Sequence, residues 1–133
     1  MAVRVLPLLW MTAFSGILMS CGQRESSANA SADPSLIGRW CYHRTNIPKY
    51  WSVLEMRRSA AGYELRDLAN DGSSGIQKLK RKGDTFAEVD GDFGDGYQID
   101  AKTGELNLVD NDGLVATATK LSNVPQANDC QSP

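Results

Sequence analysis

Residues 106–119 read LNLVDNDGLVATAT. Apolar and polar side chains alternate over 106–108 and over 116–119 within the runs 106–109 and 114–119, and the β-branched residues Val and Thr, which favour strands, are frequent there. Between the two runs, residues 110–113 are Asp-Asn-Asp-Gly, types that tolerate the positive φ angles of a tight turn. The stretch therefore predicts an antiparallel hairpin, with a type I′ turn at Asp110-Asn111-Asp112-Gly113.

The same sequence pattern begins at Leu36, where short segments of alternating apolar and polar residues are separated by Gly, Asn and Asp. No helical period occurs from there on. The expected strands are 38–44, 50–58, 62–68, 76–82, 85–90, 96–100, 105–110 and 114–121. The turns between them are expected at Ala60-Ala61-Gly62, Asn70-Asp71-Gly72, Lys82-Gly83-Asp84, Lys102-Thr103-Gly104 and Asn111-Asp112-Gly113. We predict an all-β fold, an antiparallel meander of about eight short strands.

Eight antiparallel strands leave two exposed edges unless the sheet curls shut. We therefore expect a closed or nearly closed small barrel, with an open sandwich as the alternative. So small a core needs its apolar side chains packed together, so we expect no interior cavity of about 300 Å³ or more, the lower end for small-molecule sites. The residues expected to fill the interior are Leu54, Met56, Leu65, Ile99, Leu106 and Leu108.

The amino-terminal residues have the composition of a secretory signal peptide. Arg4 is the only charge before an apolar run over 5–17, which is too short for a membrane-spanning helix. The run ends in Leu18-Met19-Ser20-Cys21, which resembles the lipobox of bacterial lipoproteins. An ordinary signal peptide cut after Ala28-Asn29-Ala30 is the alternative, although the polar residues before that site disfavour it.

The lipobox resemblance implies cleavage before Cys21, lipidation of its sulfur and acylation of the new amino terminus. Several acyl chains hold a protein on a membrane almost permanently. The expected location is the bacterial cell envelope. Gly22 favours the outer membrane if two membranes are present, because it is not the Asp that resembles an inner-membrane retention signal.

The chain divides into three parts: the signal peptide (1–20), the lipidated Cys and a flexible tether (21–35), and a small β domain (36–133). The tether has no apolar residue larger than Ala after Cys21, so it cannot bury enough surface to fold. With Cys21 assigned to lipid, Cys41 and Cys130 remain. In an oxidising, exported setting this pair predicts a disulfide.

Charge is unevenly distributed along the domain. Residues 39–82 contain ten Lys and Arg against four Asp and Glu, whereas 83–133 contain two against ten. Two interpretations stay open. The charges form a surface dipole that steers charged partners, or neighbouring strands from the two halves pair so that their opposite charges cancel. The basic run from Lys78 to Lys82 is expected to form a solvated face, and nucleic acid is not an expected partner of a tethered exported domain.

Catalytic signatures are not found in the sequence. His43 is the only histidine, no Gly-x-Ser-x-Gly motif occurs, and two cysteines are assigned to a bridge. We expect His43 to be structural, and the protein to be no enzyme and to use no cofactor. Asp90, Asp92 and Asp95 are candidate calcium ligands, but the EF-hand spacing fails, so a solvated loop without metal is expected.

Two short motifs resemble known families. Gly38-Arg39-Trp40 is similar to the Gly-x-Trp opening of lipocalins and avidins, which implies that Trp40 packs across a closed barrel end; a plain core Trp is the alternative. Ser74-Gly75-Ile76-Gln77-Lys78 resembles half of the Ser-Gly-x-x-Tyr motif of small lipidated lysozyme inhibitors, with Lys78 in place of Tyr.

The bend over 46–51 combines aromatic and basic residues, the mixture that anchors protein interfaces. We take Ile47, Lys49, Tyr50 and Trp51 as the candidate interface, with one large aromatic side chain presented to solvent beside Lys49. The leading hypothesis is a non-enzymatic envelope lipoprotein that binds, inhibits or protects against an envelope or extracellular protein. The alternatives are a lipocalin-like carrier of a small apolar ligand and a structural accessory of an envelope complex.

Overall fold

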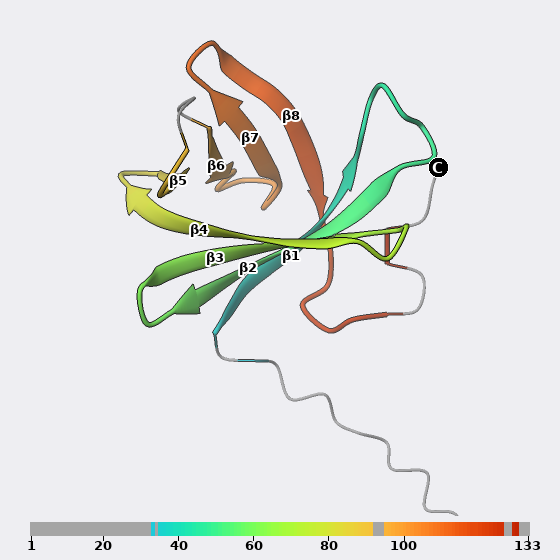
Figure 1. The fold of residues 1–133 in the computed structure, drawn as a ribbon, viewed down its shortest axis with the longest axis horizontal. Coiled ribbons are helices and arrows are strands. Elements are labelled where there is room, and N and C mark those ends of the chain that lie inside the picture. Colours follow the sequence, from blue (N-terminus) through green and yellow to red (C-terminus); the bar gives the residue numbers. More distant parts are fainter. Residues whose placement is uncertain (1–32, 34, 92–94, 127–128, 131–133) are drawn as a thin grey trace, which may run out of the picture.

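A computed structural model describes residues 33, 35–91, 95–126 and 129–130. The strands are β1 (Leu36–His43), β2 (Trp51–Ser59), β3 (Gly62–Ala69), β4 (Ser74–Lys82), β5 (Thr85–Glu88), β6 (Gly96–Ile99), β7 (Leu106–Asp110) and β8 (Gly113–Lys120). Each pairs antiparallel with the next, and β8 pairs with β1, so the sheet closes into a barrel (Figure 1). The predicted meander and its closure are confirmed. Within the described residues no helix is long and apolar enough to span a bilayer.

Glycine allows the sharp reversals between strands. The positive-φ glycines among the described residues are Gly62, Gly72, Gly83, Gly104 and Gly113. Each lies in one of the five predicted turns, because glycine reaches this region without a Cβ clash. All five predicted turn positions are therefore confirmed.

The type I′ geometry predicted for the β7–β8 turn is wrong. A type I′ turn needs positive φ at both central residues, and neither Asn111 nor Asp112 has it. Instead, Oδ1 of Asp110 accepts hydrogen bonds from the backbone N–H groups of Asp112 (2.8 Å) and Gly113 (3.0 Å). The Asp110 side chain thus makes an Asx turn, and only Gly113 has positive φ.

The barrel interior is filled by alternate residues of the strands. Its buried apolar cluster consists of Trp40, Leu54, Met56, Leu65, Leu79, Phe86, Leu106 and Ala118. Of the six predicted interior residues, Leu54, Met56, Leu65 and Leu106 are at most 3 % exposed, whereas Ile99 and Leu108 are half-buried against the cluster. The predicted packed interior is confirmed.

Trp40 is fully buried, and its indole N–H donates to the carbonyl of Gly104 at 2.7 Å. The amino group of Lys120 lies 4.3 Å from the centre of the indole ring. A cation over an aromatic face is favourable, and burial lowers the pKa of Lys120. Trp40 is thus a core residue, covered by Lys120 and bonded to the β6–β7 loop.

Open space is found at the barrel ends. A hollow of about 610 Å³ opens at the end where β1 begins, and Ile99 is the only one of the six predicted interior residues that lines it. The expectation that no such space exists therefore holds for the packed centre and fails at this mouth. The failure arises because short strands end before their side chains can fill the barrel end.

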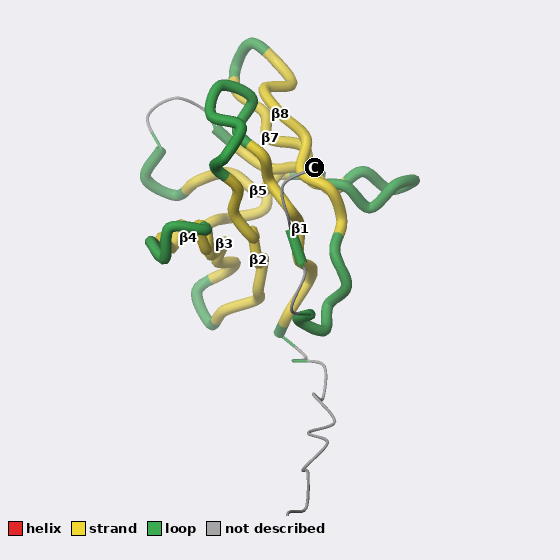
Figure 2. Tube along the Cα trace, turned by 90° about the vertical axis from the view of Figure 1, so that its right-hand side faces the viewer, coloured by secondary structure: helices red, strands yellow, loops and turns green. Residues whose placement is uncertain are grey.

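The segment after β8 leaves the barrel and returns alongside β1 (Figure 2). Cys130 forms the predicted disulfide with Cys41 of β1, across 89 residues of sequence. On the outer face of the barrel the bridge is buried with Val53, and Trp51 and Leu121 pack against it. This segment gives β1 and β2 a second, smaller core.

Candidate functional site

The barrel closes through a short pairing. The register between β1 and β8 consists of Trp40 with Lys120 and Cys41 with Thr119. By contrast, β2 and β3 pair along their whole lengths. Beyond Cys41, β1 and β8 diverge in a V (Figure 1). One edge of β8 pairs with β7. The other edge has no partner strand over residues 113–118 in the described pairings.

A groove of about 490 Å³ lies between the diverging elements, and we call it the seam groove. One wall is the bend between β1 and β2, and the other is the start of β8. Its lining residues are Tyr42, Arg44, Thr45, Asn46, Ile47, Val115 and Ala116. Ile47 is 49 % exposed and Val115 is 61 % exposed, so apolar side chains on both walls are accessible.

A β-bulge explains the exposure of the β8 wall. Leu108 pairs with Ala116 but Val109 pairs with Leu114, so Val115 is an extra residue on β8. In a regular strand Leu114 and Val115 would point to opposite faces. The bulge instead leaves both exposed, at 65 % and 61 %. Sequence reasoning predicted regular alternation here and missed the bulge.

The bend is held by its own hydrogen bonds. The N–H of Ile47 donates to the carbonyl of Arg44 at 3.2 Å, and the N–H of Tyr50 donates to the carbonyl of Ile47 at 2.8 Å. The side-chain amide of Asn70 donates to the carbonyl of Lys49 at 2.8 Å. This wall is therefore ordered before any partner binds, which reduces the entropic cost of binding.

The candidate interface residues are divided between surface and core. Ile47 and Lys49 are exposed. Tyr50 is half-buried, with the Arg44 guanidinium 4.8 Å from its ring centre, and Trp51 packs against the disulfide cluster. The expected solvent-exposed aromatic is wrong, because covering the disulfide and stacking with Arg44 use both rings. Ile47 is the exposed apolar residue of the bend.

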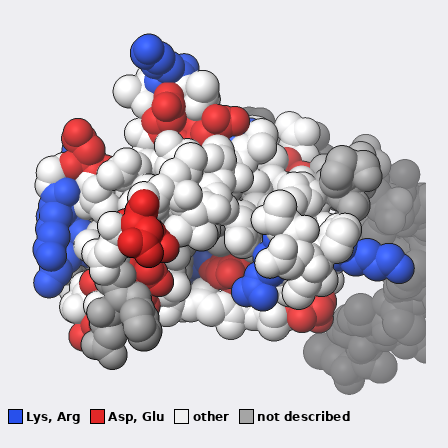
Figure 3. Space-filling model, turned by 90° about the horizontal axis from the view of Figure 1, so that it is seen from above, with Lys and Arg blue, Asp and Glu red and all other residues white. Residues whose placement is uncertain are grey.

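The face of the barrel on the side of the bend and the β7–β8 hairpin is neutral at its middle. Figure 3 shows uncharged residues across the centre of this face, with acidic and basic groups beside them and at the margin. Protein interfaces have a similar arrangement, with charged residues depleted from the centre and a polar rim.

A buried ion network fixes the carboxy-terminal segment. Nε of Arg39 donates to Oε1 of Glu55 at 3.0 Å, and its Nη1 donates to Oδ2 of Asp129 at 2.5 Å and to the carbonyl of Ser122 at 3.1 Å. Arg39 is 5 % and Glu55 is 7 % exposed. Arg57 joins Glu55 to Asp33 at the start of the domain. Sequence reasoning missed this network, since the partners of Arg39 lie up to 90 residues away.

His43 lies beside the disulfide, and its Nε2 is 3.1 Å from Sγ of Cys41. The ligand atoms of His43, Cys41 and Cys130 lie within 4.8 Å of one another, but both sulfurs are bonded to each other and offer no thiolate. The half-buried position fits the structural role predicted for His43.

The calcium candidates are only partly described. Asp90 and Asp95 are exposed, whereas Asp92 lies outside the described residues, so the expected solvated loop stays a prediction.

Cys21 also lies outside the described residues, and its lipidation stays a prediction. Ser74 and Gly75 of the inhibitor-like motif are exposed at the start of β4.

The basic strand β4 is exposed at Lys78, Lys80 and Lys82, as predicted. Its pairing with β5 places Lys80 opposite Ala87 and Lys82 opposite Thr85, so no acid stands across from these two lysines. In the described pairings no Lys or Arg of 39–82 is directly opposite an Asp or Glu of 83–133. Directly opposite residues therefore do not cancel the charge, and both interpretations, a steering dipole and balance between neighbouring strands, stay predictions.

Comparison with known family models, curated proteins and solved structures finds no match to this chain. The geometry of the described residues and the sequence patterns therefore carry the functional argument.

Proposed function

We propose that this protein is a non-enzymatic, lipid-anchored binding protein of the bacterial envelope, and that it captures an extended segment of a partner protein in the seam groove. The observation that carries the proposal is the early divergence of β1 and β8. It leaves a strand edge beside accessible apolar side chains.

Strand addition is the mode of binding that suits such an edge. An extended peptide gains backbone hydrogen bonds from an exposed strand, while pockets for alternate side chains supply selectivity. The β8 edge offers the backbone groups of 113–118, and Ile47 and Val115 offer apolar contacts on either side. A long accessible edge is otherwise an aggregation hazard, which partner binding would remove.

The position of the groove agrees with the proposed anchor. The chain enters the barrel at Leu36, at the end opposite the seam groove (Figure 1). Anchoring a protein through Cys21 and its amino-terminal tether would thus leave the groove end of the barrel free to face away from the membrane. A coil of about 14 residues allows the domain to range about 20 Å from its anchor.

Site-specific photocrosslinking tests the groove. A photoreactive amino acid is placed at Val115 in the bacterium that makes the protein, and at Ile76 as the control. Ile76 is 60 % exposed on β4, so the two positions match in exposure and apolar character. We expect a discrete protein adduct from position 115 that Ile47→Asp abolishes, and none from position 76. Equal adducts from both positions, or adducts that survive Ile47→Asp, would contradict the proposal.

The anchor is tested separately. Cys21→Ala should prevent incorporation of radiolabelled palmitate and either release the protein from membranes or leave it unprocessed. Equal labelling of the wild type and the variant would refute lipidation at Cys21 and leave the groove argument intact.

A further inference from the structure

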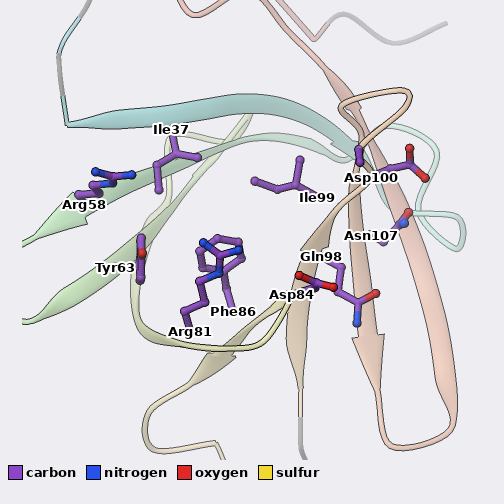
Figure 4. A pocket seen from close by; sticks show the side chains of 11 residues that line it. Ile37, Arg58, Tyr63, Arg81, Asp84, Phe86, Gln98, Ile99, Asp100 and Asn107 are labelled. Carbon is purple, nitrogen blue, oxygen red and sulfur yellow. The ribbon is translucent and has the colours of Figure 1, made fainter.

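The 610 Å³ hollow lies at the opposite end of the barrel from the seam groove and is independent of it. Its floor is made of aromatic and aliphatic side chains that pack on the core: Ile37, Tyr63, Phe86 and Ile99 (Figure 4). The rings of Tyr63 and Phe86 meet edge to face, with centroids 5.0 Å apart. The floor is therefore suited to a planar or branched apolar group.

Two guanidinium groups line the same hollow. Arg58 comes from the end of β2 and Arg81 from the end of β4, and both side chains are exposed. Within the described part of the chain neither forms an ion pair. The Arg81 guanidinium lies 5.7 Å from the ring centre of Phe86, so a positive charge sits directly at the edge of the apolar floor.

The acidic groups at the hollow do not neutralise the positive charges of Arg58 and Arg81. Oδ1 of Asp100 accepts the backbone N–H groups of Lys102 (2.7 Å) and Thr103 (2.9 Å), and Figure 4 shows its carboxylate pointing away from the hollow. The pKa of Asp100 is lowered by these backbone hydrogen bonds, from Thr103 and then Lys102. Asp84 lies on the far rim beside Gln98 (Figure 4). Among the described residues that line the hollow, two cationic side chains thus face Asp84 across an apolar floor.

We propose that this hollow binds a small amphipathic anion, a carboxylate carried on an aromatic or branched aliphatic body. The body packs on Tyr63 and Phe86, and the carboxylate accepts hydrogen bonds from Arg58 and Arg81. Guanidinium groups match carboxylates in geometry and charge. Nε of Arg81 donates to the carbonyl of Gly83 at 2.9 Å, but the apolar ligand expected of a lipocalin-like carrier would leave both guanidinium groups without an anionic partner.

Naphthalene-2-carboxylate and naphthalene-2-carboxamide are suitable probes, because they share a ring system and differ in charge. Each is titrated by NMR into the chain from residue 22 onward, exported so that its disulfide forms. We expect saturable shifts at Tyr63 and Phe86 with the carboxylate, and about tenfold weaker binding of the amide. Arg58→Gln and Arg81→Gln should each weaken carboxylate binding by about tenfold and leave amide binding unchanged.

Lys80→Gln is the matched control, since it removes one positive charge from β4 on the strand face that points away from the hollow. It should leave carboxylate binding within about twofold of wild type. Asp84→Asn should leave it unchanged or strengthen it. The proposal is overturned if the amide binds as tightly as the carboxylate, if Lys80→Gln weakens binding as much as Arg58→Gln, or if neither probe gives saturable shifts in a protein with a folded spectrum.

Discussion

Two half-buried polar side chains, Tyr97 and Asp129, are expected to make the stability of this barrel depend on pH. The hydroxyl of Tyr97 donates to Oε1 of Gln77 at 2.5 Å, and burial raises the pKa of Tyr97 to about 12. Burial alone would also raise the pKa of Asp129, but a backbone hydrogen bond from Gln126 and the guanidinium of Arg39 outweigh it and lower that pKa. The two groups therefore respond at opposite ends of the pH range.

Tyr97 should destabilise the fold at high pH. Its folded pKa exceeds the unfolded value of about 10, so the stability it contributes is fully present below pH 10 and is lost as the pH rises through about 12. Denaturant unfolding over this range should show a steeper loss of the free energy of unfolding in wild type than in Tyr97→Phe. Tyr50→Phe, on the surface bend, is the control. Identical slopes for Tyr97→Phe and wild type would show that this phenol does not govern alkaline stability.

Asp129 should contribute most to the free energy of unfolding at neutral pH. Asp129→Asn removes a charged acceptor from the buried Arg39, which should lower the free energy of unfolding by about 2 kcal/mol at pH 7. The folded pKa lies below the unfolded value of about 3.9, so this contribution is present above that pH and is lost as the pH falls through the folded pKa. Asp84→Asn is the exposed control. A deficit that is equally large at pH 2 would contradict a role for the ion pair.

At the scale of strands and turns, local sequence determines most of the structure. Every strand boundary lies within two residues of its predicted position, because alternation and turn glycines act over a few neighbouring residues. The bulge at Val115 was not predictable, since it depends on the register with β7. The Arg39 network was not predictable either, because three distant segments meet only after the carboxy-terminal segment returns to β1. The seam groove is lined by the bulged Val115, so the candidate site is less predictable than the fold.

The disulfide joins the carboxy-terminal segment to the first strand and should be a major source of stability. Replacing Cys41 and Cys130 together by Ser should lower the free energy of unfolding by about 4 to 5 kcal/mol, the chain-entropy value for a loop of this length. Denaturant unfolding of the exported protein measures this difference, and intact mass establishes the oxidation state of the wild type. A loss below about 1 kcal/mol would indicate that the ion network alone holds the segment.

In the whole molecule the two ends of the barrel differ. The end at which the chain enters has an open hollow with an apolar floor and two guanidinium groups that form no ion pair among the described residues. The opposite end has the seam groove, with exposed Ile47 and Val115 and an edge of β8 that no described strand pairs with over residues 113–118. The proposed tether would join the first end and leave the second free for the proposed partner. One small barrel thus has room for a small ligand and a protein partner at the same time.

Amide hydrogen exchange of the exported protein, alone and with the partner identified by crosslinking at Val115, tests the central claim most directly. Binding by strand addition predicts new protection over residues 113–118 and over the bend at 42–47, with the β3–β4 hairpin unchanged. Ile47→Asp should remove this protection while leaving exchange in the free protein unaltered. Protection confined to the β3–β4 hairpin, or a complex in which the amides of 113–118 exchange as fast as in the free protein, would contradict the account.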